Sequence, residues 1–180
     1  MSGSGWTSTS LPYLTPRHAG ETDTWTEEAR AAGRRGGQRI LHAGETAAPP
    51  DVTRALGLAG PEIVVVRRRL IELDGVPVEL TDTYYPADIA SGTPLAGTAK
   101  IRGGAVTLLA QLGYVGERVV ETVTARMPDA REQRQLSLGP AEPVLHLTRT
   151  TYDGSDRAIQ ADLMLMPSGR QQLRYEIRIG

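Results

Sequence analysis

Two apolar, β-branched segments joined by Asp74 and Gly75 set the strongest limit on the fold. Residues 63–73 and 76–85 have the length and composition of strands. An Asp-Gly pair readily takes the positive φ angles of a two-residue hairpin turn, so the two strands are expected to run antiparallel. A sheet built on this hairpin is therefore at least partly antiparallel.

Turn residues and apolar periodicity divide the rest of the chain into further strands and helices. The alternation of residues 118–126 has the period of two that is typical of a strand. Other strands are expected at 38–45, 144–152, 158–166 and 171–179, and helices at 24–32, 50–56, 106–112 and 129–138. With about six long strands, several joined by short turns, the pattern predicts an α+β domain: an antiparallel sheet flanked by helices.

The segment before residue 38 has a different character, with Gly, Ser, Thr and Pro and no apolar period. Thr24 or Thr26 is expected to cap a short helix that Gly33 ends, and residues 34–37 are expected to break the chain again. Residues 1–37 are therefore interpreted as an arm or interdomain linker, and residues 38–180 as the domain.

Composition limits the class of protein. The 180 residues suffice for one domain with its own core. A net charge of −1 lacks the basic excess on which nucleic-acid binders rely. Without cysteine the chain has neither disulfides nor Cys-based zinc sites. The apolar runs are shorter than a membrane span and residues 1–10 do not resemble a signal peptide, so a cytoplasmic location without membrane contact is expected.

Catalytic and metal-binding motifs are scarce. His18, His42 and His146 are widely separated, and none lies at a spacing typical of metal ligands. Neither a Gly-x-Ser-x-Gly elbow nor a P-loop occurs. No cofactor, metal or catalytic residue is therefore assigned.

Arg102, Gly103 and Gly104 precede a predicted helix. Two glycines leave the backbone N–H groups accessible, and the helix dipole favours an anion there. The alternative interpretation is a loop-to-helix turn that requires unusual φ angles.

Three consecutive arginines lie within the first strand of the hairpin. Alternation places Arg67 and Arg69 on one face of the strand and Arg68 on the other. A buried arginine requires a partner, either a carboxylate such as Glu121 or an anionic ligand. The alternative is a surface arginine at a sheet edge. Arg170 and Tyr175, near the C-terminus, suit a polar ligand and an ordinary amphipathic strand equally well.

The order of seven segments carries a family resemblance. They read VVVRRRLIELDG, VPVELTDTYYPADI, IRGGAVTLLAQLGY, ERVVETVTARMP, DAREQRQLSL, PVLHLTRTTYD and GRQQLRYEI. Over residues 38–180 this order resembles the UTRA domain of HutC-type GntR transcriptional regulators, in particular the actinobacterial branch. The resemblance implies a chorismate-lyase-like fold with a ligand cleft, binding of a small-molecule effector, and a homodimer formed through the UTRA domain. DNA binding in that family belongs to a separate winged helix-turn-helix domain, for which residues 1–37 show no recognition-helix pattern.

The resemblance also implies a ligand site. The arginine that grips an anionic ligand group corresponds to Arg69, whereas Ile71 and Thr81 replace a second arginine and a carboxylate of the family. Gly103 and Gly104 correspond to the helix start that holds an anion, and Gln160 replaces an acidic residue. The complete predicted set is Arg69, Thr81, Thr83, Tyr85, Arg102, Gly103, Gly104, Glu121, Gln160, Arg170 and Tyr175. These replacements predict a ligand unlike phosphorylated amino sugars.

Two other functions are compatible with the sequence. A protein-interaction module without a ligand would show a cleft filled by apolar side chains. A chorismate-lyase-like enzyme would need a catalytic carboxylate, for which Glu79 and Glu121 are the candidates.

Overall fold

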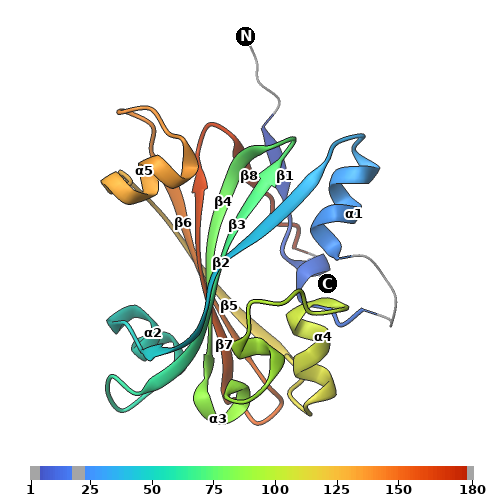
Figure 1. The fold of residues 1–180 in the computed structure, drawn as a ribbon, viewed down its shortest axis with the longest axis vertical. Helices are drawn as coiled ribbons and strands as arrows, with labels where there is room; N and C mark the ends of the chain where they lie inside the picture. Colours follow the sequence, from blue (N-terminus) through green and yellow to red (C-terminus); the bar gives the residue numbers. More distant parts are fainter. Residues whose placement is uncertain (1–4, 18–22, 178–180) are drawn as a thin grey trace.

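The computed structural model describes residues 5–17 and 23–177, and a six-stranded antiparallel sheet forms its centre (Figure 1). The strands follow the order β2-β3-β4-β7-β6-β5. Their bounds are β2 Gly36–Ala47, β3 Ile63–Leu73, β4 Val76–Pro86, β5 Arg118–Arg126, β6 Val144–Tyr152 and β7 Ala158–Pro167. The predicted α+β class and antiparallel sheet are confirmed.

The hairpin between β3 and β4 is also confirmed. Leu73 pairs with Val76 across the turn, and Asp74 and Gly75 have φ angles of 53° and 80°. Both central residues thus lie in the left-handed region that a tight hairpin turn requires. This register places every second residue of β3 and β4 on the same face of the sheet.

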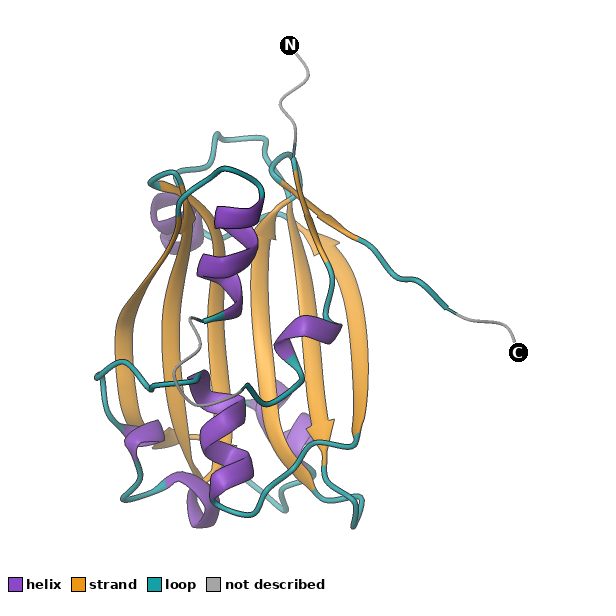
Figure 2. Ribbon diagram, turned by 90° about the vertical axis from the view of Figure 1, so that its right-hand side faces the viewer, coloured by secondary structure: helices purple, strands orange, loops and turns teal. Residues whose placement is uncertain are grey.

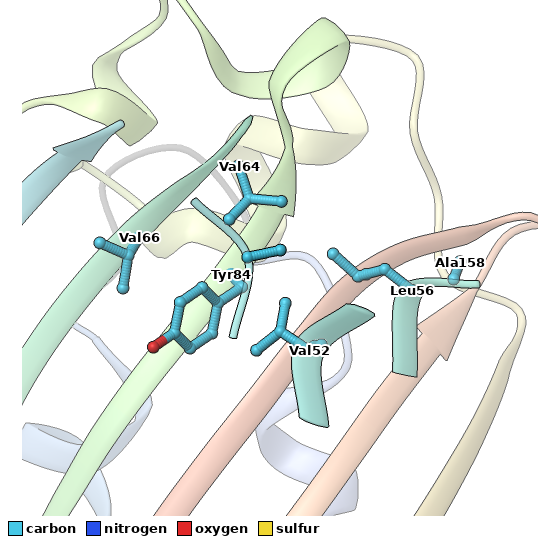
Figure 3. Close-up of a cluster of buried hydrophobic side chains, with 8 residues drawn as sticks. Val52, Leu56, Val64, Val66, Tyr84 and Ala158 are labelled. Carbon is cyan, nitrogen blue, oxygen red and sulfur yellow. The ribbon is translucent and has the colours of Figure 1, made fainter. Parts of the chain in front are cut away.

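Helices cover both faces of the sheet (Figure 1). On one face, α2 (Pro50–Leu56) packs Val52 and Leu56 against Val64, Val66 and Tyr84 (Figure 3). Another helix on this face, α5 (Ala130–Leu136), begins with a capping box between Asp129 and Glu132.

The opposite face carries α1 (Thr24–Ala31) and α4 (Gly104–Gln111), which lie one above the other in front of the sheet in Figure 2. Leu109 of α4 packs with Val65 and Tyr85, and α3 (Ala87–Ala90) and a short 3-10 helix, η2 (Pro94–Ala96), close this end. Trp25 of α1 packs with Ile71 towards the other end of β3. The space between α1 and α4 is where the candidate site lies.

Residues 23–37 differ from the expectation in two respects. Asp23, not Thr24 or Thr26, caps α1 by accepting a hydrogen bond from the Thr26 backbone N–H at 3.0 Å. The glycines at 36 and 37 do not break the chain but begin β2. A Cβ at Gly36 would lie 2.9 Å from both Nε1 and the carbonyl oxygen of Trp25, so glycine here permits the close packing of α1 on β2.

The two ends of the chain meet outside the main sheet. Strand β1 (Trp6–Ser8) pairs in parallel with β8 (Gln171–Leu173), and a short 3-10 helix, η1 (Leu11–Tyr13), follows β1. The predicted strand 171–179 is therefore too long: it ends at Leu173, where the pairing with β1 ends. Residues 178 and 179 of that prediction, and His18, lie outside the described residues.

Candidate functional site

A cavity of about 180 Å³ lies between the α1/α4 face of the sheet and the N-terminal segment. We call it the Arg69 cavity. Its wall on the sheet is formed by β3, β4, β6 and β7, and its opposite wall by residues 8–17 together with the first residues of α1 and α4. Its lining includes seven of the predicted site residues: Arg69, Thr81, Thr83, Tyr85, Gly103, Gly104 and Gln160.

Sheet register explains why these side chains meet. Arg69 of β3 pairs with Thr81 of β4, and one same-face step along β4 brings Thr83 opposite Asp162 of β7. Asp162 pairs in turn with Arg149 of β6. Since these positions share one face, their polar side chains all project towards the cavity.

Arg69 retains unused hydrogen-bonding capacity. Its Nη2 donates to Oγ1 of Thr83 at 3.1 Å, but its Nε is buried and has no hydrogen-bond partner among the described residues. Arg69 also makes no ion pair within that part of the chain. A buried guanidinium N–H without an acceptor costs free energy, so this end of the cavity favours a ligand that supplies one.

Asp162 is held by its neighbours on two strands. Its Oδ1 accepts from Thr83 at 2.6 Å and its Oδ2 accepts from Nε2 of Gln160 at 2.8 Å. Both carboxylate oxygens therefore have donors, and Thr83 joins the carboxylate to Arg69. The hydroxyl of Tyr85 on β4 has no hydrogen-bond partner among the described residues, although the side chain lines the cavity and is buried. Burial raises the pKa of this phenol, so it remains a neutral donor.

The N-terminus of α4 contributes backbone N–H groups to the same cavity. Gly103 caps the helix with a φ of 75° and Gly104 follows at 86°, both in the left-handed region. The predicted glycine-led helix start is thus present beside Tyr85 and Arg69, where the helix dipole favours a negative group. Arg17 joins the N-terminal segment to this helix, because its backbone N–H donates to Oγ1 of Thr107 at 2.9 Å.

Glu79 lies at the other end, where it pairs with Ile71 across the hairpin. Glu79 as a whole residue is half-buried, its carboxylate accepts a hydrogen bond from Thr81, and it makes no ion pair with any described residue. Burial raises the pKa of Glu79, against the opposing effects of the Thr81 hydrogen bond and the charges of Arg69 and Arg149.

Arg149 ties the sheet to the N-terminal segment. Its Nε donates to Glu121 at 2.7 Å and its Nη2 donates to Oγ of Ser10 at 2.9 Å. Ser10 in turn donates to Glu121 at 2.7 Å. Burial alone would raise the pKa of Glu121, but the Ser10 hydrogen bond and the Arg149 charge hold it below its usual range.

The expectation that Glu121 pairs with a strand arginine of the hairpin is wrong, because the register puts it opposite Arg149. Arg67 instead donates to the backbone carbonyls of Pro94, Leu95, Gly97 and Ala99. Arg67 is thus an anchor for the loop that carries η2.

Four predicted site residues lie outside the lining of the Arg69 cavity: Arg102, Glu121, Arg170 and Tyr175. Arg102 is exposed. Arg170 donates to the carbonyls of Pro77, Leu136 and Ser137 and so holds the end of α5. Glu121 and Tyr175 line a separate surface hollow.

Sequence reasoning missed several lining residues. Asp162 lies one same-face step from Gln160, so alternation along β7 is a signal that identifies it. Tyr13 and Trp25 come from the predicted linker, where no periodic pattern marks them.

Comparison with known proteins identifies the family of this chain. Residues 31–172 match the family model of the UTRA domain. The chain belongs to the UTRA domain family. An uncharacterized HTH-type transcriptional regulator of Streptomyces coelicolor is 32% identical over 132 residues, which are 71% of this chain and 49% of that protein.

A second relative is the HTH-type transcriptional repressor PhnF of Mycolicibacterium smegmatis, 29% identical over 137 residues, 76% of this chain and 55% of that protein. This UTRA chain therefore spans about half the length of the curated relatives it matches. The crystal structure of the PhnF effector domain has a TM-score of 0.73 at 26% identity, covering 87% of this chain and 95% of that one.

A crystal structure of a GntR-family transcriptional regulator shares the fold, with a TM-score of 0.82 at 18% identity, covering 100% of this chain and 72% of that one. The relatives of this UTRA domain are thus transcriptional regulators. Within residues 5–17 and 23–177, no helix is long and apolar enough to cross a membrane.

Proposed function

We propose that this UTRA domain senses a small polar or anionic metabolite, which binds in the Arg69 cavity. The observation that carries the proposal is that Arg69 lines the cavity while its buried Nε has no acceptor among the described residues. An anionic group there would accept from Arg69 while the N-terminus of α4 stabilises its charge. The regulator relatives support a sensing role.

The proposed output is a change in DNA binding by a separate winged helix-turn-helix domain. The relatives are HTH-type regulators of about twice the length matched here. The N-terminal segment forms one wall of the Arg69 cavity, so an effector would contact the part of the chain that precedes the sheet. We further propose that the domain acts in the cytoplasm as a homodimer, which sedimentation of the purified chain tests.

A thermal-shift screen against acidic and sugar metabolites tests the sensing role. A ligand at about 100 times its Kd stabilises the folded state by about 2.7 kcal/mol. For a domain of this size the expected rise in Tm is about 5–10 °C. The rise is expected to disappear in Arg69→Ala.

Arg68→Ala is the matched control. Arg68 lies next to Arg69 on β3, but its side chain points to the opposite face and pairs with Asp82. Each variant is compared with its own unliganded Tm, so a loss of stability does not obscure the result. A shift that survives in Arg69→Ala and is lost in Arg68→Ala would place the ligand elsewhere, and no shift from a broad panel would favour the protein-interaction alternative.

The lyase alternative has less support. Of its two candidate carboxylates, Glu121 is occupied by Arg149 and Ser10. We therefore propose binding without catalysis.

A further inference from the structure

Charge balance within the Arg69 cavity is incomplete. Arg149 is paired with Glu121, Asp23 with Lys100, and Arg17 with Glu27. Arg69 and Asp162 remain, joined through the hydroxyl of Thr83, so these opposite charges compensate one another. Glu79 is then the cavity carboxylate that forms no ion pair with any described residue, and the charges of Arg69 and Arg149 only partly offset the effect of burial on its pKa.

Glu79 also has spare acceptor capacity. One of its oxygens accepts from Thr81, and the other has no donor among the described residues. Asp162 differs, because both of its oxygens already have donors. A hydrogen-bond donor on a ligand therefore finds its free acceptor at Glu79.

Two aromatic side chains flank this end of the cavity. Tyr13 of η1 lines the cavity and packs against the cluster that contains Trp25 and Ile71. Burial raises the pKa of its phenol, as do its hydrogen bond to Glu28 and, to a smaller extent, the charge of Glu79. Trp25 lines the cavity as well and packs with Ile71, which is the residue opposite Glu79. A carboxylate beside aromatic rings is a favourable environment for an ammonium group, through ion pairing and cation–π attraction.

We propose that the effector carries a protonated amine that binds against Glu79, in addition to the polar or anionic group that Arg69 receives. This inference rests on the proposed sensing function and names its ligand class: a small amino acid or amino-alkyl phosphate. Glu79 and Thr81, the partner of Arg69, are two residues apart on β4, so their Cα atoms lie about 7 Å apart along the strand. A molecule of a few carbon atoms spans this distance.

Pairs of compounds that differ only in the amine test the proposal by titration calorimetry on the full chain. The pairs are 4-aminobutanoate with butanoate, 5-aminopentanoate with pentanoate, and O-phosphoethanolamine with ethyl phosphate. In at least one pair the amine is expected to increase affinity by about tenfold or more, as a charge-assisted hydrogen bond would.

Glu79→Gln keeps the size of the side chain and removes its charge, so the preference for the amine is expected to vanish in this variant. Asp156→Asn is the control, because Asp156 is an exposed carboxylate paired with Arg118. It is expected to retain the full preference.

Equal affinity within every pair, absence of binding by all six compounds, or an amine preference that survives Glu79→Gln would each overturn the proposal. The sensing function is separately tested, because it stands if other acidic or sugar metabolites bind in an Arg69-dependent manner. If no metabolite of any class binds, both proposals fail together.

The titratable and charged groups around Glu79 are Arg69 on β3, Arg149 on β6, Asp162 on β7 and Tyr13 on η1. The Glu79→Gln comparison separates the contribution of Glu79 from theirs, since all four remain in the variant.

Discussion

The hydroxyl of Thr83 donates to Oδ1 of Asp162 at 2.6 Å, and both side chains are buried, with exposed fractions of 1% and 3%. The same hydroxyl oxygen accepts from Arg69. Thr83 therefore separates two opposite charges by one hydroxyl group and forms a hydrogen bond with each. Without it the buried carboxylate would lose a donor in a place that water reaches poorly.

Thr83→Val is nearly isosteric and removes only this hydroxyl. The expected loss in free energy of unfolding is about 1–3 kcal/mol, because a buried carboxylate oxygen and a guanidinium N–H both lose a partner. Denaturant unfolding measures the loss. Thr122→Val on the edge strand β5 is the control: Thr122 is exposed, and its substitution is expected to change stability by about 0.5 kcal/mol or less. Equal losses in the two variants would show that the hydroxyl of Thr83 contributes nothing specific.

How far the sequence predicts this fold depends on how many residues separate the pairing partners along the chain. The β3–β4 hairpin was predictable because Asp74 and Gly75 encode the turn within two residues. The pairing of Trp6 with Gln171 joins opposite ends of the chain, and no local pattern encodes it.

The same distinction applies to the candidate site. Alternation along a single strand predicted that Arg69 and Arg68 point to opposite faces, and the register brings Thr81 and Thr83 to the face of Arg69. Whether Glu121 contacts Arg69 or Arg149 depends on the order of the strands in the sheet, and alternation along one strand does not predict that order. Ser10 lies in a segment without periodicity and reaches the site only through tertiary packing.

Glu79→Gln is expected to raise the Tm of the unliganded domain at neutral pH. Burial raises the pKa of Glu79 in the folded state, so the folded state binds this proton more readily than the unfolded chain. The stabilisation from that proton is fully present at a pH below the pKa of Glu79 in the unfolded chain. It is lost as the pH rises through the higher pKa of Glu79 in the folded domain. The Tm difference between variant and parent should therefore shrink as the pH falls below about 4, where Glu79 becomes protonated in both states. A Tm difference that stays constant across this pH range would contradict a raised pKa for Glu79 in the folded domain.

Affinity for an amine-bearing ligand should also depend on pH. An ammonium group binds the ionised carboxylate, so binding must remove the proton from Glu79 when the pH is below its raised pKa. Affinity is expected to fall as the pH decreases through this pKa, and to become much less pH-dependent in Glu79→Gln. Calorimetry in buffers of different ionisation enthalpy measures the released proton directly. Proton release that persists in the variant would assign it to another group.

Arg67→Met tests the structural role of the other inward-facing arginine. Arg67 is buried and donates to carbonyls of Pro94 and Ala99, both at 3.1 Å, as well as to those of Leu95 and Gly97. Methionine fills much of the volume but leaves these acceptors without a donor, so we expect a loss of about 2–4 kcal/mol in unfolding free energy. Arg39→Met is the control, because Arg39 forms an exposed pair with Glu72 that is worth about 1 kcal/mol or less. Similar losses in both would contradict an anchoring role.

Hydrogen exchange tests whether an occupied cavity acts on the N-terminal segment. Residues 8–17 form one wall of the cavity, and their attachment includes the Arg149 hydrogen bond to Ser10 and the Arg17 backbone bond to Thr107. An effector enclosed between this segment and the sheet must slow the local opening that exposes the amides of both walls. With a saturating ligand from the thermal-shift screen, slower exchange is expected in residues 6–17 and at the start of α4. Helix α2 packs on the opposite face and supplies the internal reference. If exchange slows as much in α2 as in the cavity walls, the ligand stabilises the domain only globally. If the slowing is confined to the cavity walls, the effector acts locally on the N-terminal segment.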